Sequence, residues 1–275
     1  MSLSNQSDNL QNPATRFMEW SGSDGSVSYF DKTLGEKGAK VNVPLPFTFI
    51  PLDMLATVSG FNDASGSGIW SNEIKMDTFK TAILNVKDKN GTIAKGLYAD
   101  IKDSVAAKGG KFTQSVYVAY KDENGALKIG NIKFKGASLT GGKRKEGSKE
   151  VEVGAWMEFT KGNKVLGKAI SISKDETPCR KGSNAYYIPK FSLNTISEAT
   201  MQTAIELDKE LQVYLGQYFQ QQALPEQSKQ EPTMSVEDAV RTFNNKGVPL
   251  EVLGNQPATE AWNKFEESTE EQLPF

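Results

Sequence analysis

Histidine is absent from this chain of 275 residues, and cysteine occurs once, at Cys179. Histidine is the commonest general base and metal ligand of proteins, so its absence excludes Ser-His-Asp and Cys-His catalysis. A single cysteine cannot form an intramolecular disulfide, which fits a reducing compartment. The usual zinc sites are disfavoured for the same reasons, and we expect neither a metal nor a cofactor.

Long apolar runs are missing as well. No stretch approaches the roughly 20 apolar residues that a membrane-spanning helix needs, so no membrane partner is expected. The first six residues, MSLSNQ, contain no basic region followed by an apolar run, so the sequence predicts no signal peptide and a cytoplasmic location. Hydrophobic residues make up 37% of the chain, which is sufficient for a folded core.

Charge is unevenly distributed, although the net charge is only −2. Residues 1–200 contain 27 basic and 21 acidic side chains, whereas residues 201–275 contain 5 and 13. Within 111–190 the basic excess is larger, with 16 basic against 8 acidic side chains. A basic body that carries an acidic tail suggests an anionic partner for the body.

The body is rich in signals for β-hairpins. Asn-Gly turns at 90–91 and 124–125, and a Gly-Asn turn at 162–163, each separate two runs of alternating apolar residues. The hairpins predicted from them have strands over 79–87 and 92–101, 112–120 and 127–139, and 151–160 and 164–173. Three successive hairpins favour a mainly β fold, a single antiparallel barrel or sandwich.

Two irregularities are expected within these strands. Gly130-Asn131 interrupts the alternation of its strand and predicts a β-bulge. The prolines of 41–52 lack backbone donors, so this strand is predicted to lie at a sheet edge or to bend.

The first convincing helix follows the body. Thr195 is a suitable N-cap, and Glu198 completes a capping box. Apolar side chains then recur every three or four residues, so an amphipathic helix is predicted over 193–222, packed on the body or on another copy of the chain. Residues 223–265 are polar and predict a flexible linker with a short helix near 235–244, and residues 1–11 predict a flexible arm.

The chain ends in an acidic segment with a small apolar hook, over 266–275. Such a peptide suits capture by a partner whose apolar pocket is surrounded by basic side chains. A frayed acidic terminus is the alternative. The side chains expected to bind the partner are Glu266, Glu267, Glu270, Glu271, Leu273, Pro274 and Phe275.

Aromatic and basic side chains share the solvent-facing sides of the predicted strands. Alternation turns Trp156 and Tyr117 away from the apolar faces of their strands. Single-stranded nucleic acid needs flat rings for its bases and a basic groove for its phosphates. The rings expected to stack on bases are Trp20, Tyr29, Trp70, Tyr117, Trp156, Tyr186 and Tyr187. The side chains expected to hold phosphates are Lys75, Lys80, Lys133, Lys135, Lys143, Arg144, Lys168, Arg180 and Lys181.

Purely structural roles are the alternative for both the aromatic and the basic side chains. The aromatic rings also suit a second packing layer, in which the helix over 195–222 covers Trp156 and Tyr117. The basic stretch 140–149 predicts a flexible loop, which is either a phosphate clamp or a solvated surface loop.

Enzymatic interpretations find less support. Residues 162–169 nearly match a phosphate-binding loop, but Ala169 stands where a magnesium-binding Ser or Thr is required, and the following residues predict a strand instead of a helix. Carboxylates are numerous, yet none forms an evident pair in an apolar setting. A carboxylate-dependent enzyme on a β fold remains a third alternative, after a non-catalytic β-sandwich structural or interaction protein of a phage.

The order of basic β body, amphipathic helix, polar linker and acidic tip ending in Leu-Pro-Phe resembles single-stranded DNA-binding proteins. The bacterial family has an OB-fold, a disordered linker and an acidic tip that commonly ends in Ile-Pro-Phe. Here residues 270–275 stand in that place, with Leu273 in place of the isoleucine and glutamates in place of the usual aspartates. The resemblance implies that the tip recruits replication and repair proteins.

The body is more similar to the larger replication proteins of bacteriophages, including crAss-like phages. The stretches that carry this similarity are 12–20, 45–49 and 69–73, and it extends over 12–192. It implies an OB-fold-like antiparallel barrel. Because the body is about twice the size of a minimal OB barrel, extra strands are needed.

Together these observations predict a non-catalytic protein that coats single-stranded DNA in replication, recombination or repair. The expected organisation is a flexible arm over 1–11, an OB-like nucleic-acid-binding domain over 12–192, a helix over 193–222, a linker over 223–265 and an acidic tip over 266–275. Self-association is also compatible with the amphipathic helix. The acidic tip is further expected to compete with DNA for the basic groove of its own chain.

Overall fold

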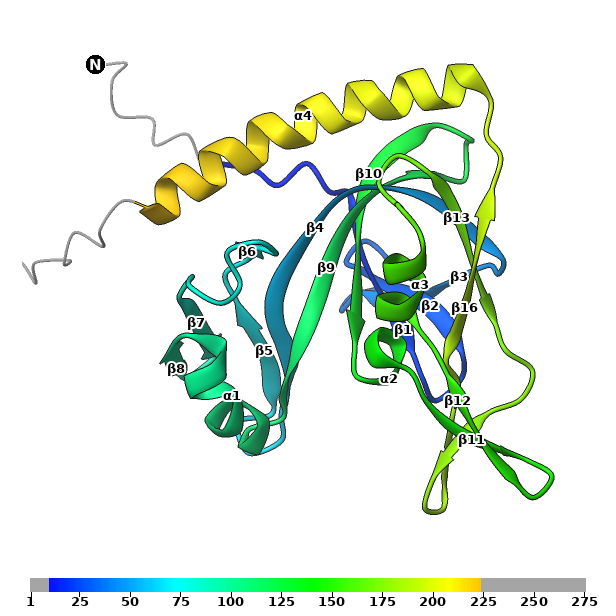
Figure 1. Cartoon of the computed structure of the whole chain (residues 1–275). Helices are drawn as coiled ribbons and strands as arrows, with labels where there is room; N and C mark the ends of the chain where they lie inside the picture. The colour runs from blue at the N-terminus through cyan, green and yellow to red at the C-terminus, as the bar shows by residue number, and fades with distance from the viewer. Residues whose placement is uncertain (1–9, 224–275) are drawn as a thin grey trace, which may run out of the picture. The chain divides into compact units, whose positions relative to one another are not determined.

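The computed structural model describes residues 10–223 and shows a mainly β architecture followed by one long helix (Figure 1). The expected linker, its short helix at 235–244 and the acidic tip lie outside the described residues, as does most of the N-terminal arm. The coarse prediction of a β body followed by a helix is confirmed.

One large sheet contains most of the strands. Its path runs β3-β2-β1-β10-β9-β4-β5-β7-β8, and β13, β16 and β6 join it through β4. Neighbours are antiparallel except β1 and β10, which are parallel. In path order the bounds are β3 (Ala39–Val43), β2 (Ser26–Asp31), β1 (Arg16–Ser21), β10 (Leu127–Lys135), β9 (Gly110–Lys121), β4 (Phe47–Asn62), β5 (Ser67–Ser71), β7 (Leu84–Asp88) and β8 (Gly91–Gly96).

The side branches of the sheet come from two places in the chain. β6 (Ile74–Lys75) pairs with β4, and so does β13 (Ala169–Lys174), which in turn pairs with β16 (Pro189–Asn194). Among the described strands, β3 pairs only with β2 and β16 only with β13, so this strand path does not close into a barrel.

β4 is the central strand of the molecule. It pairs with β9 along one side, and along the other side it pairs in turn with β13, β6 and β5. Its apolar side chains point to both faces, which is typical of a strand covered on both sides. The predicted edge position is therefore wrong. Pro51 instead lies at a register shift of the β4–β9 ladder, opposite the gap between β13 and β6.

Two of the three predicted hairpins are confirmed, namely β7–β8 and β9–β10. The β9–β10 ladder is continuous, so the bulge predicted at 130–131 is wrong. The third hairpin is also wrong. Residues 151–160 contain the end of β12 (Lys149–Val153) and then the helix α3 (Trp156–Gly162), and β13 pairs with β4 and β16.

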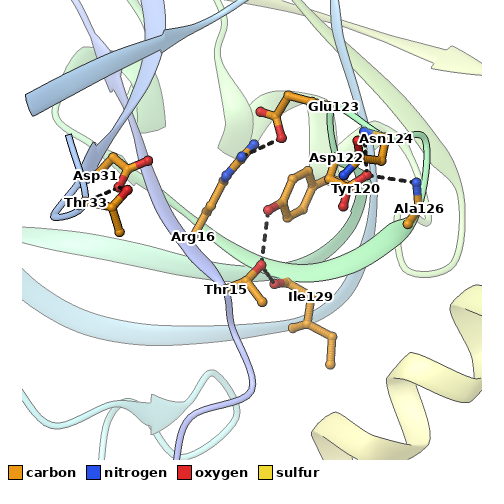
Figure 2. Close-up of polar contacts among 10 residues, drawn as sticks. All are labelled: Thr15, Arg16, Asp31, Thr33, Tyr120, Asp122, Glu123, Asn124, Ala126 and Ile129. Carbon is orange, nitrogen blue, oxygen red and sulfur yellow. Dashed lines mark hydrogen bonds and ion pairs between the residues drawn. The ribbon is translucent and has the colours of Figure 1, made fainter.

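The turn of the β9–β10 hairpin is held by its own side chains and by the start of β1 (Figure 2). The Asp122 carboxylate accepts hydrogen bonds from the backbone N–H groups of Asn124 and Ala126. The Arg16 guanidinium donates to Glu123 at 2.7 Å and lies over the ring of Tyr29. These contacts fix the parallel placement of β1 beside β10.

The inner faces of these strands enclose the largest apolar core. Met18, Phe49, Val118 and Phe134 come from four strands, and Trp156 of α3 stacks on Phe134 with ring centroids 4.8 Å apart. The short helix α2 (Ala137–Thr140) places Leu139 in the same core. Residues expected to form a third hairpin thus form the helix α3, whose Trp156 indole covers this core.

The opposite face of β4 and β9 is covered by α4 (Glu198–Ala223), which appears in yellow above these strands in Figure 1. Leu211 and Leu215 of α4 are buried against Leu52, Leu55 and other side chains of β4 and β9. The predicted amphipathic helix is thus confirmed, and it packs on the body of its own chain.

The far half of β4 belongs to a separate lobe with its own core. Val58, Ile69 and Val86 pack against Ile101 and Val105 of the helix α1 (Tyr98–Ala107), a helix that the strand pattern did not predict. α1 covers only one face of β5 and β7 (Figure 1), and the other face of this lobe carries the site described next.

Two small hairpins complete the fold. β11 (Gly142–Glu146) pairs with β12, and β14 (Cys179–Lys181) pairs with β15 (Asn184–Tyr186). The stretch 140–149, predicted as a flexible loop, is therefore mostly a hairpin, because Gly147 at φ 63° supplies the tight turn.

Candidate nucleic-acid interface

Four residues from four neighbouring strands form a row across the open face of the lobe. Ser59 of β4 pairs with Lys111 of β9 on one side and with Trp70 of β5 on the other, and Trp70 pairs with Lys87 of β7. Directly paired residues project to the same side of a sheet. The indole of Trp70, which is 48% exposed, therefore stands between two exposed lysines.

Phe61 adds a second ring on the same side. It follows Ser59 by two residues on β4, so both side chains share one face. Its partner on β5 is Gly68, which leaves the space beside the phenyl ring open, and Phe61 is 55% exposed. Phe61 and Trp70 are diagonal neighbours across the β4–β5 ladder, close enough for their rings to act together.

Two further lysines continue this face toward the centre of the sheet. Lys133 and Lys135 of β10 pair with Ser115 and Thr113 of β9, which share the side of Lys111 by alternation. The whole surface, here named the lysine–aromatic face, consists of Phe61, Trp70, Lys87, Lys111, Lys133 and Lys135. It joins flat rings and cations, the combination that single-stranded nucleic acid requires.

The lysines of β10 differ in their surroundings. Lys135 Nζ lies 2.8 Å from the Glu19 carboxylate. Burial lowers the pKa of the Lys133 ammonium, while the nearby Glu73 carboxylate acts in the opposite direction. A partly desolvated cation attracts a phosphate more strongly than a fully hydrated one, because less water screens the interaction.

A buried polar network lies beside Lys133 and under α4. The Glu73 carboxylate accepts hydrogen bonds from Ser115 Oγ and, at 2.9 Å, from the Tyr117 hydroxyl. Asn131 Nδ2 donates to Ser115 Oγ at 2.7 Å, and the Tyr218 hydroxyl of α4 accepts the Glu73 N–H at 2.8 Å. Burial, followed by the Glu73 charge, raises the pKa of the Tyr117 hydroxyl. This network fixes the sheet beneath the lysines and attaches the end of α4 to it.

Three of the rings predicted to stack are buried. Tyr117 is covered by α4 and Trp156 lies in the inner core, and both are fully buried. Trp20 is also buried in the inner core, where its Nε1 donates to the Tyr187 carbonyl at 2.9 Å. These rings are unavailable to bases in this structure. The alternative, in which the helix over 195–222 covers both Tyr117 and Trp156, is confirmed for Tyr117 only, because Trp156 packs in the inner core, apart from the cluster that α4 covers. The prediction for Trp156 failed because a helix replaced the expected strand.

Other predicted rings are partly exposed but engaged elsewhere. Tyr29 packs on the inner core beneath Arg16. The ring of Tyr187 lies 3.9 Å from Lys174 Nζ, and Tyr186 packs on a small cluster around Cys179. Of the predicted rings, the structure places only Trp70 on the lysine–aromatic face.

The predicted basic residues are dispersed. Lys143 pairs with Glu150 at 2.9 Å, and Arg144 pairs with Glu146 and Asp175 at 2.7 Å each; both lie on β11, outside the sheet that carries the lysine–aromatic face. Lys75 lies 5.2 Å from the ring centroid of Phe219 in α4. The remaining residues are exposed but belong to separate segments: Lys80, Lys168, Arg180 and Lys181.

Phe61, Lys87 and Lys111 were missed in the sequence. The signal for Lys87 was present, because it follows the apolar Val86 at the end of the strand predicted over 79–87, whereas Lys111 lies one residue before the strand predicted over 112–120. Phe61 gave no signal, since it stands between Gly60 and Asn62, outside every predicted strand. Only the pairing of Phe61 with Gly68, and the placement of α1 on the other face, expose it.

The described part of the chain offers no alternative centre for metal chemistry, because residues 10–223 contain no group of three or more side chains suited to hold a metal ion. No helix within the same residues is both long and apolar enough to cross a membrane. Comparison with family models, with curated protein sequences and with solved structures finds no match to this chain.

Proposed function

We propose that this protein binds and coats single-stranded DNA without catalysing a reaction, as part of replication, recombination or repair in the cytoplasm. The observation that carries the proposal is the exposed pair Trp70 and Phe61, set between Lys87 and Lys111 on an open sheet face. Aromatic rings stack on any base, so the recognition does not depend on sequence.

Each part of the face has a defined role in this proposal. Trp70 and Phe61 stack on successive bases, and Lys87 and Lys111 neutralise the phosphates on either side. Lys133 and Lys135 continue the basic path toward β10. The OB-like relationship of the body belongs to the proposal as well, and so does recruitment of replication and repair proteins by the acidic tip at 266–275.

Binding is best tested through the fluorescence of Trp70. The chain has four tryptophans, of which Trp20 and Trp156 are buried and Trp262 lies outside the described residues. In a Trp262→Phe background, titration with oligo-dT is expected to quench the emission and to saturate, because a base stacks on the one exposed indole. The same titration with oligo-U measures the preference for DNA over RNA.

Substitutions then locate the site. Trp70→Ala is expected to weaken binding roughly 5- to 150-fold, since stacking on one ring contributes about 1–3 kcal/mol. Lys87→Glu should weaken binding and flatten its salt dependence. Lys102→Glu, on the exposed surface of α1 behind the lobe, is the matched control and should leave affinity nearly unchanged. Absence of saturable quenching at low salt would refute the proposal.

A further inference from the structure

Two more exposed rings lie at the other end of the same sheet face. Phe17 of β1 is 51% exposed and Phe30 of β2 is 58% exposed. Their neighbours Met18 and Tyr29 pair with each other and face the inner core. By alternation, Phe17 and Phe30 therefore both project outward, one step beyond the recorded ladder of β1 and β2.

The position of the Phe30 ring is set by the turn after β2. A Cβ built on Gly38 would lie 2.6 Å from the Phe30 ring, so the ring rests directly on the glycine backbone. Gly38 has φ 75°, a conformation that favours glycine. The phenyl ring is thus supported from one side while the other stays open to solvent.

The surroundings of these rings are basic. Lys40 of β3 pairs directly with Phe30, and Lys32 and Lys37 lie exposed in the turn between β2 and β3. Glu36 is the opposing exposed carboxylate of that turn. Glu19 of β1 is engaged by Lys135. A ring pair surrounded by lysines repeats, in different strands, the arrangement around Trp70.

The pairing of β1 with β10 places the two ring pairs on the same face of the sheet. Phe17 pairs with Asn131 of β10, and Glu19 pairs with Lys133, so both lie on the side that carries the lysine–aromatic face. Lys133 and Lys135 occupy the strand between the two ring pairs. From β2 to β5 the path crosses five strand intervals of about 4.8 Å, or about 24 Å across the strands. The registers align Phe17 with Tyr117 of β9 and Trp70 with Lys111 of β9, six residues or about 20 Å apart along the strand, so the two ring pairs are separated by about 31 Å.

We propose that Phe17, Phe30 and Lys40 form a second aromatic platform, and that one single-stranded nucleic acid crosses the sheet from this platform, over Lys133 and Lys135, to Trp70 and Phe61. The inference rests on the proposed function and deepens it. A nucleic-acid strand is favoured over an apolar protein partner because lysines flank the rings and because the surface continues into the lysine–aromatic face.

Two platforms joined by a basic path make affinity depend on oligonucleotide length. At about 3.4 Å per stacked nucleotide, a separation of about 31 Å corresponds to about nine nucleotides. A strand of four nucleotides reaches one platform only, whereas a strand of twenty engages both, and the second contact then forms at high effective concentration.

The test compares labelled dT4 and dT20 by fluorescence anisotropy, with Phe17→Ala/Phe30→Ala set against Phe61→Ala/Trp70→Ala. For dT20, each double variant is expected to bind at least about 10-fold more weakly than the parent, since each loses two stacking rings. Quenching of Trp70 by dT4 should be unaffected by Phe17→Ala/Phe30→Ala. Phe17→Tyr/Phe30→Tyr keeps both rings and should retain dT20 affinity.

Controls separate this inference from the proposed function. Leu166→Ala/Ile205→Ala removes two other exposed apolar side chains and should leave dT20 binding unchanged. If Phe17→Ala/Phe30→Ala binds dT20 like the parent while Phe61→Ala/Trp70→Ala does not, the second platform is refuted and the function stands. If the parent protein proves to be a dimer and Phe17→Ala/Phe30→Ala dissociates it without changing dT20 affinity, the second platform is also refuted. The two rings then form a contact with a second copy of the chain. Parental dT20 affinity in both double variants refutes the function itself.

Discussion

At the scale of single residues, the neighbours of a ring decide its role. Trp70 and Trp156 are the same residue type, yet Trp156 stacks on Phe134 inside the core while Trp70 stands exposed between two lysines. The difference comes from what covers each side chain. α1 occupies the far face of β5, which leaves the Trp70 face open, whereas Trp156 is itself part of the helix that closes the inner core.

A residue-scale prediction concerns Asp24, in the turn between β1 and β2. Hydrogen bonds from the hydroxyls of Ser21, Ser23 and Ser26 lower the pKa of its carboxyl to about 2, from an ordinary 3.8. Because the folded pKa lies below the unfolded one, the contribution to stability is complete above pH 3.8 and is lost as the pH falls toward 2. Asp24→Asn should thus lower the melting temperature at pH 6 and have progressively less effect below pH 4.

Asp63→Asn, in the exposed turn between β4 and β5, is the control for the same melting curves and should cause a smaller change at pH 6. A melting-temperature difference for Asp24→Asn that stayed constant between pH 6 and pH 2.5 would contradict the account.

At the scale of elements, α4 separates the sheet face into a covered and an open part. Its apolar stripe buries Ile50, Leu52 and Tyr117, and Tyr218 near its end is tied to Glu73. The lysine–aromatic face begins where this cover ends. The same helix therefore supplies core packing and sets the boundary of the candidate binding surface.

An element-scale prediction tests the packing of α4. Leu211→Ala removes a fully buried side chain between the helix and the sheet and should cost about 2–5 kcal/mol of unfolding free energy in urea. Val213→Ala, two residues away on the exposed side of the same helix, should change stability by about 0.5 kcal/mol or less. Equal losses for the two variants would mean that α4 does not pack on the sheet as described.

At the scale of the whole molecule, charge is divided between the body and the tail. Residues 1–200 have a basic excess, and residues 201–275 have 13 acidic against 5 basic side chains. If the body binds DNA as proposed, the acidic tip, which lies outside the described residues, is expected to compete with DNA for the same basic side chains.

A whole-molecule prediction follows from this competition. Deletion of 266–275 should tighten oligo-dT binding several-fold at low salt, because it removes four glutamates that compete with phosphates. The gain should shrink as salt rises, since added ions screen the attraction between the acidic tail and the basic body. Replacing the four glutamates by glutamine, with Leu-Pro-Phe kept, should have the same effect. Affinity that is unchanged at 20 mM salt, measured by anisotropy, would refute the competition.

The sequence by itself determined the features that depend on local chemistry. Asn-Gly turns with alternating flanks are enough to define β7–β8 and β9–β10, and apolar spacing is enough to define α4. The predicted N-cap Thr195 is wrong, because α4 begins at Glu198 and the Ser197 hydroxyl accepts the Thr200 N–H. The absence of histidine, the charge asymmetry and the acidic tip are likewise properties of the sequence alone.

Only the tertiary structure decided which strands pair and which rings remain exposed. The pairing of β13 with β4 joins residues more than a hundred positions apart, which no local pattern encodes. An aromatic side chain has the same hydrophobicity in a core as on a surface, so its exposure depends on what packs over it. Trp156 and Tyr117 were covered, while Phe61 and Trp70 were left open beside Lys87 and Lys111, and that contrast defines the candidate site.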